Sequence, residues 1–304
     1  MSVTPDSLSD PGAGAPLVSP PDAEADVHPD ESAFKAKALE YTEKYALPAL
    51  FAITFIFFST WSKTGDNFLS SQNIKNVLGY QAVYGILALA IMIPLVCGEF
   101  DFSVGSAAGL CQVLVAGFMV KNGWPVWAAI AGAIAIGALI GLSNGNTVAR
   151  VGVNSLIVTL GVASVLAGSV QWYTGGLSIS NNIPQSFIDL GAGEWFGLPK
   201  TIYYLAGVAG VLLASHNGSA SPQLGTVVTT LGALAAAYLG ATSIKPGRFN
   251  VLGTLIAVFF LAFTVTGLSL AGVANWINDV FNGAALFVAV LISTIIGRKR
   301  AGVA

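Results

Sequence analysis

The amino-acid sequence predicts an all-α polytopic membrane protein, built as a bundle of about nine apolar helical segments. Of the 304 residues, 54% are hydrophobic and only 9% are charged, and the mean hydropathy is +0.74. A soluble globular domain carries roughly 25% charged residues, so most of this surface is expected to face lipid. The apolar runs are continuous and approach the roughly 20 residues that a helix needs to cross a bilayer. A β-barrel would instead show alternating segments of about ten residues.

The chain is expected to have two parts, a polar tail with a surface lead over residues 1–44 and a transmembrane domain over residues 45–304. Residues 1–34 are rich in Pro, Ser, Asp and Glu, a composition typical of disordered segments. Gly and Ala are abundant in the transmembrane domain, where small residues let helices pack closely. Candidate spans lie at about 46–61, 76–97, 103–120, 125–148, 155–173, 200–215, 225–243, 251–270 and 277–297.

The basic residues predict the orientation, because Lys and Arg gather on the cytoplasmic side of membrane proteins. Lysines before the first span place the N-terminus in the cytoplasm, and the basic residues at 298–300 place the C-terminus there as well. Two cytoplasmic ends need an even number of spans, whereas nine are counted. The odd number of spans draws attention to the region between Lys200 and Lys245. This region contains no Asp, Glu, Lys or Arg, although a cytoplasmic loop would be expected to be polar.

The segment GEFDFSVGSAAG places two carboxylates between apolar runs. Ionisable residues within a membrane are energetically costly and are usually functional, so Glu99 and Asp101 are candidates for a role in gating. They lie at the boundary of a span, where Asp101 or Ser103 can instead cap the following helix. Both interpretations stay open at the level of sequence.

A second polar segment, NGNTVARVGVNSLIVTLG, forms a predicted cytoplasmic turn. Arg150 is most simply a topology signal, and Asn154 or the serine after it can cap the next helix. Asn144, Asn154 and Thr159 are also candidates for a polar path through the membrane. The Thr159 hydroxyl has an alternative, since it can bond to a carbonyl of its own helix.

Further polar and aromatic residues lie near the predicted outer face. Trp172 and Tyr173 are typical of interfacial anchors, and aromatic rings also stack on sugars, which would give them a role at an outer opening. Asp279 and Asn282, early in the last predicted span, can face a polar cavity. A lone acid near a helix start also interacts favourably with the helix dipole.

No residue pattern indicates an enzyme or a metal site. Cys97 and Cys111 lie in apolar runs and are expected to be small buried hydrophobes. His28 and His216 stand alone, so histidines form no zinc or catalytic cluster. The glycine-rich stretches lack the Gly-Lys-Ser/Thr of a phosphate-binding loop, so this chain is not expected to hydrolyse nucleotide. The net charge of −2 gives no basic field that would indicate nucleic acid.

Four segments together resemble a known family. They are GEFDFSVGS, GLSNGNTVARVGVNSLIVTLGVASVLAG, YTGGLSIS and YLGATSIKPGRFNVLGTLIA, within about residues 45–297. In order and spacing they are similar to the membrane permease subunit of bacterial ABC importers for ribose-like monosaccharides. Phe102 stands where that family usually has Leu, which is a mild departure.

The resemblance implies a protein of the bacterial plasma membrane that moves a monosaccharide by alternating access. It implies about ten spans, a second permease subunit, two cytoplasmic ATPase subunits and an extracytoplasmic sugar-binding protein. ATP is then used by the partner ATPase, and this chain binds no cofactor. Candidates for gating or ATPase-side contact are Glu99, Asp101, Ser103 and Arg150. Candidates for the transport path are Asn144, Asn154, Thr159, Trp172 and Tyr173.

The second departure from the family concerns the region without charge. Family members carry a cytoplasmic loop that docks into the ATPase between two spans, and here residues 198–225 join the start of one span to the end of the next. One span and the coupling loop are therefore expected to be missing. Either residues 200–215 form a re-entrant turn, which leaves backbone groups in need of partners, or the second half of the chain is inverted.

Three other interpretations remain. The first is a permease remnant that inserts, and pairs with an intact permease, but couples poorly or not at all to an ATPase. The second is an ion-coupled secondary transporter, which the scarcity of ionisable residues within the spans disfavours. The third, an intramembrane enzyme, is disfavoured because no paired catalytic residues are present.

Overall fold

The computed structural model describes residues 31–195, 198–203, 227–274 and 276–300. The chain divides into two compact units, of which the first ends at Leu39 and the second runs from Glu40 to Ala304. Helix α1 (Glu31–Thr60) begins in the first unit and ends in the second, which contains all later elements. The predicted disordered tail lies outside the described residues, except that residues 31–34 belong to α1.

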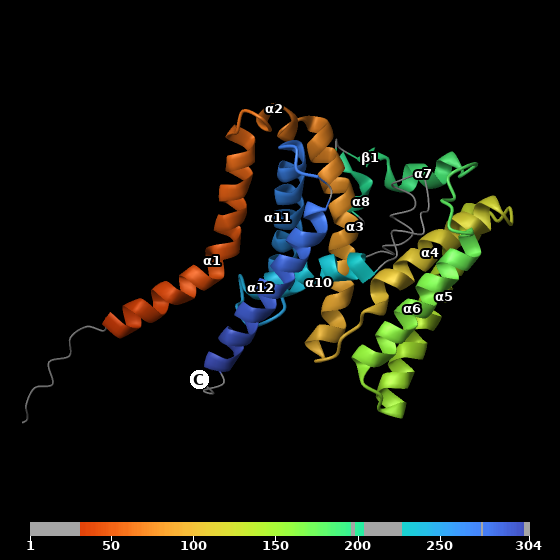
Figure 1. The fold of residues 1–304 in the computed structure, drawn as a ribbon. Helices are drawn as coiled ribbons and strands as arrows, with labels where there is room; N and C mark the ends of the chain where they lie inside the picture. The colour runs from red at the N-terminus through yellow and green to blue at the C-terminus, as the bar shows by residue number, and fades with distance from the viewer. Residues whose placement is uncertain (1–30, 196–197, 204–226, 275, 301–304) are drawn as a thin grey trace, which may run out of the picture. The chain divides into compact units, whose positions relative to one another are not determined.

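The prediction of an all-α membrane protein is confirmed. Strands β1 (Glu194–Trp195) and β2 (Leu198–Pro199) form a short antiparallel hairpin, and the other regular elements of the described residues are helical. Figure 1 shows the helices in chain order. After α1 they are α2 (Gly65–Phe68), α3 (Ser71–Val96), α4 (Ser103–Val120), α5 (Val126–Asn146), the π-helix η1 (Thr147–Val151), α6 (Ser155–Thr174), α7 (Gln185–Gly191), α8 (Lys200–Tyr203), α10 (Val227–Ala241), α11 (Val251–Leu270) and α12 (Ile277–Arg300).

Eight of the nine predicted spans coincide with helices. Within the described residues, five helices are long and apolar enough to cross a membrane, namely α3, α4, α5 with η1, α6 and α11. Helices α10 and α12 contribute shorter apolar stretches, Thr229–Ala241 and Ile277–Ile292. The apolar second half of α1 covers the first predicted span. The remaining prediction, residues 200–215, falls on α8 and then outside the described residues.

Polar side chains mark several helix starts, as expected where the first N–H groups of a helix lack partners. Ser70 accepts a hydrogen bond from the backbone N–H of Asn73 at 3.2 Å at the start of α3. Asn154 accepts from the N–H of Leu156 at 2.9 Å, which confirms it as the cap of α6. Asn250 accepts from Gly253 at 2.7 Å at the start of α11.

The second unit contains two helix groups, each with its own buried apolar cluster. Helices α4, α5 and α6 lie side by side and enclose a cluster that includes Val113, Ala133 and Val170. Helices α3, α10, α11 and α12 enclose another, which includes Ile91 and Ala237. Helix α4 also contacts α10 and α3, so it joins the two groups.

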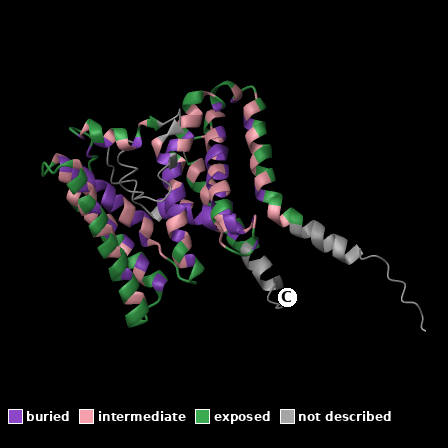
Figure 2. Cartoon of the chain, turned by 180° about the vertical axis from the view of Figure 1, so that it is seen from behind, coloured by how far each residue is buried: buried purple, intermediate pink, exposed green. Residues whose placement is uncertain are grey.

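The outward faces of α5 and α6 are largely exposed and apolar. In Figure 2 these helices carry long exposed stripes, and Leu139, Leu142 and Ile157 are each more than 60% exposed. Without water to drive apolar side chains inward, a helix next to lipid can present Leu and Ile outward. This pattern is that of a membrane-embedded bundle.

Glycine sets the distance between α10 and α11. The backbones at Gly240 and Gly253 approach so closely that a Cβ atom at either position would overlap the backbone of the other helix. Asn250 reinforces this contact, because its amide donates to the carbonyl oxygen of Gly240 at 3.2 Å. Close approach at small residues is a common way to pack helices in a membrane.

The described residues on either side of 204–226 bear on the predicted orientation of the second half of the chain. Thr201 donates to the carbonyl oxygen of Gly79 at 3.2 Å, so α8 lies beside the first half of α3. The N–H of Ile244 donates to the carbonyl oxygen of Lys44 at 3.0 Å, at the other end of the bundle. Residues 201 and 244 therefore lie at opposite ends of the bundle, and Figure 1 shows α11 running away from the end near Ile244 and α12 running back toward it.

The turn between α10 and α11, with Lys245 and Arg248, follows the contact of Ile244 with Lys44, and Figure 1 shows the end of α12 at this end of the bundle, called here the basic end. The end of α5, which leads to Arg150 on η1, lies here as well, because Asn144 of α5 donates to Ser103 at the start of α4. An inverted second half is therefore wrong. The structure agrees with the alternative in which both termini lie on the same side. The predicted re-entrant turn at residues 200–215 and its connection to α10 fall, from residue 204 on, outside the described residues.

Candidate functional site

A cavity of about 600 Å³ opens between α3, α10, α11 and α12, toward the end of the bundle opposite the basic end. Its walls combine apolar side chains with amides and hydroxyls from all four helices. The α3 part follows helical spacing, with Asn73, Asn76, Tyr80 and Tyr84 on one face. Other polar lining residues include Gln81, Thr229, Thr266, Asn278, Asp279 and Asn282.

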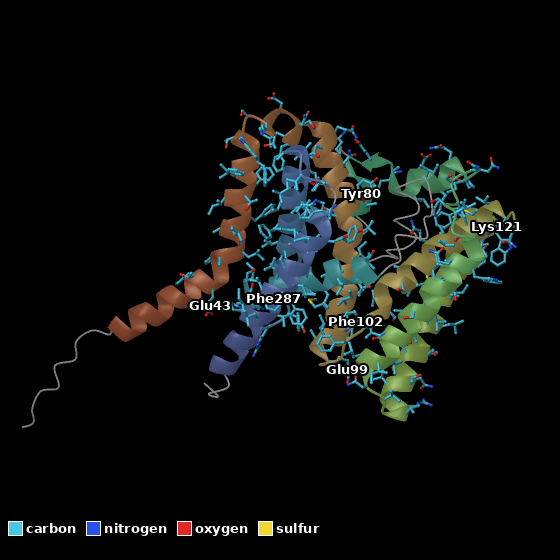
Figure 3. The ribbon with its side chains drawn as sticks, viewed as in Figure 1. Glu43, Tyr80, Glu99, Phe102, Lys121 and Phe287 are labelled. Carbon is cyan, nitrogen blue, oxygen red and sulfur yellow. The ribbon has the colours of Figure 1, made fainter. Side chains whose placement is uncertain are left out.

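Two of these residues were singled out by the sequence. Asp279 and Asn282 line the cavity, as one of their two interpretations predicts. Asp279 also lies in the first turn of α12, where a negative charge interacts favourably with the helix dipole, so both interpretations hold. Sequence reasoning missed the residues of α3. Their signal is the recurrence of Asn and Tyr every three to four positions along the first half of α3, as with Asn73, Asn76 and Tyr80. Figure 3 shows Tyr80 on this helix.

At the basic end, the connection between α3 and α4 and the first turn of α4 are held by side chains from two other helices, α6 and α10. The N–H of Phe102 donates to the Thr159 hydroxyl at 3.1 Å, and the N–H of Phe100 donates to the Ser155 hydroxyl at 3.2 Å. The N–H of Gly105, in the first turn of α4, donates to the Thr230 hydroxyl of α10 at 3.1 Å. Figure 3 shows Glu99 and Phe102 at this end of the molecule.

The carboxylate of Asp101 organises the start of α4. It accepts from the N–H of Ser103 at 2.8 Å and from the Ser103 hydroxyl at 2.6 Å. The amide of Asn144, on α5, donates to the same hydroxyl at 2.8 Å. The side chain of Asp101 therefore satisfies one of the free N–H groups of the helix, as the capping interpretation predicts. The set Asp101, Phe102, Ser103, Asn144, Thr159 and Thr230 is called the α4 anchor below.

The anchor brings together four of the predicted residues. Asp101, Ser103, Asn144 and Thr159 are linked within it, although they belong to different motifs. Asn144 also borders a small cavity of about 260 Å³ between α5 and α6. The Thr159 hydroxyl additionally donates to the carbonyl oxygen of Ser155 in its own helix at 2.8 Å, which is the alternative that the sequence offered.

The other predicted residues lie apart. Glu99 is exposed in the connection before the anchor, and Arg150 is exposed on η1 at the same end. Asn154 caps α6. None of the nine predicted site residues is among those that line the 600 Å³ cavity. The predicted transport path therefore does not form a single site within the described part of the chain.

At the end opposite the basic end, two aromatic residues differ in their exposure and contacts. Trp172 is 84% exposed, as an interfacial anchor would be. The ring of Tyr173 packs against Gly117 of α4, and the ammonium of Lys121 lies 4.3 Å from its centroid. Lys121 also donates to the carbonyl oxygen of Tyr173 at 2.7 Å. Tyr173 thus fastens the end of α6 to the end of α4.

Comparison with known proteins identifies the class to which this architecture belongs. Residues 73–193 match the family described as the permease component of branched-chain amino acid transport systems. The autoinducer 2 import system permease protein LsrD of Escherichia coli K12 is 30% identical, over 68% of this chain and 79% of its own length. The LsrD proteins of Klebsiella pneumoniae and Photorhabdus luminescens are 28% and 27% identical over similar shares. No solved structure matches the chain.

The chain belongs to this family of ABC-importer permeases. It is a transport subunit of the sugar-importer type and not an enzyme, and it is a multi-pass protein of the inner membrane. Permeases of this family work with ATPase and binding-protein partners. The resemblance that the four sequence segments indicated is thereby confirmed.

The alignment also bears on the length of the chain. The match to the Escherichia coli relative runs over 263 positions, yet 68% of the 304 residues here is only about 207. Part of the aligned region of the relative therefore has no counterpart in this chain. A shortened chain agrees with the expectation that a span and its loop are missing within residues 198–225, of which only residues 198–203 are among the described residues.

Proposed function

We propose that this chain is a permease subunit of an ATP-driven importer for a ribose-like monosaccharide, which enters through the cavity between α3, α10, α11 and α12. The observation that carries the proposal is a polar-lined cavity of about 600 Å³ within an otherwise apolar bundle. Small-molecule sites in proteins typically have about 300–1,000 Å³ and a few convergent polar groups. Asn73, Asn76, Gln81 and Asn282 supply donors and acceptors for the hydroxyl groups of a sugar.

The orientation of the chain in the membrane follows from the charge distribution. We place the basic end in the cytoplasm, since Lys and Arg gather on that side. The cavity then opens to the outside, where a sugar-binding protein delivers the substrate. A pair of ATPase subunits uses ATP at the basic end, and this chain binds no cofactor itself. A second permease subunit completes the assembly.

Alternating access requires that ATP binding favours one of two permease conformations over the other. The α4 anchor lies at the basic end and joins α4 to α5, α6 and α10. It is therefore the place where a movement at the ATPase side would reach both helix groups. Glu99 and Arg150, exposed at the same end, are the proposed contacts with the ATPase.

Reconstituted transport tests the proposal. The permease is placed in proteoliposomes with its ATPase and binding protein, and ATP-dependent uptake of labelled ribose is measured. Autoinducer 2 is the second substrate to test, because the relatives are named for its import. Asn282→Leu is expected to lower uptake at least about tenfold through an unpaired substrate hydroxyl. Asn122→Leu, in the exposed turn after α4, is the matched control and should leave uptake unchanged. Equal uptake by both variants would exclude the cavity as the path.

A second candidate function is that of an uncoupled permease, and the shortened alignment favours it. In that case the chain inserts and pairs with an intact permease, but ATP hydrolysis does not drive it. Co-purification with the ATPase distinguishes the two. Retention of the ATPase together with ATP-dependent uptake supports the importer, and absence of both supports the uncoupled form.

A further inference from the structure

The cavity between α3, α10, α11 and α12 carries one carboxylate, that of Asp279, and no Lys or Arg among its lining residues. We propose that Asp279 makes this cavity selective by charge, so that it accepts uncharged polyhydroxylated molecules and rejects anionic ones such as sugar phosphates. The proposal deepens the proposed function and rests on it for the class of substrate. The charge selectivity itself is a property of the cavity.

No basic side chain is among the described residues that line the cavity with Asp279. The side chains that share the cavity wall are amides, hydroxyls and apolar groups, among them Asn278 and Asn282 on the same helix. Lys75, on α3 near the same opening, lies outside the lining and pairs with Glu194 at 2.8 Å. Its charge is therefore balanced elsewhere, and the field inside the cavity is that of a carboxylate.

The shape of the site strengthens that field. Asp279 is exposed as well as lining the cavity, and a cleft with low-dielectric walls focuses the field of the charged groups that line it. An anion that enters is repelled by Asp279. An uncharged polyol meets no such repulsion, and its hydroxyl groups can donate to the carboxylate in charge-assisted hydrogen bonds.

Thiol-modification rates measure the selectivity without any need for transport. Thr266, in the wall contributed by α11, is replaced by cysteine in a Cys97→Ser background, because Cys97 is exposed while Cys111 is buried. The full chain in lipid nanodiscs is treated with a cationic trimethylammonium thiosulfonate and with an anionic sulfonate thiosulfonate. We expect Asp279→Asn to lower the ratio of the cationic to the anionic rate by about fivefold, since the carboxylate attracts one reagent and repels the other.

Two further variants control the result. Asp189→Asn removes the same charge from α7, where the carboxylate accepts from Gln185 at 2.9 Å outside the cavity, and should leave the ratio unchanged. Asn76→Asp adds a second carboxylate to the wall and should raise the ratio. An unchanged ratio in Asp279→Asn, an equal fall in Asp189→Asn, or no labelling at position 266 would each overturn the proposal.

Transport supplies the substrate-level measurement. In proteoliposomes, ribose 5-phosphate is expected to compete with ribose uptake poorly in the wild-type protein and about fivefold better in Asp279→Asn. Competition that is the same in both proteins contradicts a role for Asp279 in substrate choice. If wild-type protein takes up no sugar, the proposed function fails, while the thiol rates still decide whether the cavity selects by charge.

Discussion

Thr230 of α10 accepts a hydrogen bond from the backbone N–H of Gly105, in the first turn of α4, at 3.1 Å. The N–H groups in the first turn of a helix lack partners within that helix, so a helix start buried in protein needs acceptors from outside it. The same Thr230 hydroxyl lies 3.4 Å from the carbonyl oxygen of Phe102. One side chain thus joins the two helix groups at the point where α4 begins.

Replacing Thr230 by Val should destabilise the protein. The change keeps the shape of the side chain and leaves the buried N–H of Gly105 without an acceptor, which lowers the free energy of unfolding by about 1–2 kcal/mol. Thermal unfolding of the purified protein in detergent measures the effect. Thr230→Ser keeps the hydroxyl and should retain most of the stability. A loss of stability in Thr230→Ser without a loss in Thr230→Val would show that the methyl group matters and the hydrogen bond does not.

Asn144→Leu tests the other side of the α4 anchor. The amide of Asn144 is buried and donates to the Ser103 hydroxyl, which in turn donates to Asp101. Its loss removes one member of a connected network, and we expect a destabilisation of about 1–3 kcal/mol. The double variant with Ser103→Ala should cost less than the sum of the two single changes, because the residues interact directly. Strict additivity would contradict the coupling.

The close contact between α10 and α11 predicts that the stability of the protein depends strongly on the glycine at position 240. Gly240→Ala places a methyl group against the backbone of α11 and should reduce stability by about 1–3 kcal/mol through overpacking. Gly141→Ala on α5 is the matched control, because no atom lies within 4 Å of the added Cβ. There the change should be neutral or stabilise by up to about 1 kcal/mol, since Ala favours helix more than Gly does. Thermal unfolding of both variants, side by side, decides the matter.

The expected side of the membrane for the C-terminus follows from the placement of residues 201 and 244 at opposite ends of the bundle. A cysteine added after Ala304, in a Cys97→Ser background, is expected to resist a membrane-impermeant thiol reagent in intact cells and to react once the cells are opened. Labelling in intact cells would mean that the second half is inverted. In that case the bond between Ile244 and Lys44 would not form in the membrane.

Much of the fold can be predicted from local sequence. The apolar runs predict eight of the described helices because a backbone in lipid must satisfy its own hydrogen bonds, which only a helix does within one segment. The caps are local as well, as with Asn154, whose side chain reaches an N–H two residues away. The cavity is harder to predict from the sequence. Asn73 and Asn76 lie on a polar stripe of α3, and this stripe lines a cavity only because α11 and α12 face it.

The sequence by itself determined the membrane class, the family and the positions of most spans, because these depend on composition, run length and short motifs. Only the tertiary structure placed residues 201 and 244 at opposite ends of the bundle, since that depends on the distant residues that Thr201 and Ile244 contact. Only the tertiary structure joined Asp101, Asn144, Thr159 and Thr230 around one helix start. Their hydrogen bonds connect residues far apart in the chain. Such contacts depend on how the helices pack, and short-range sequence patterns do not predict that packing.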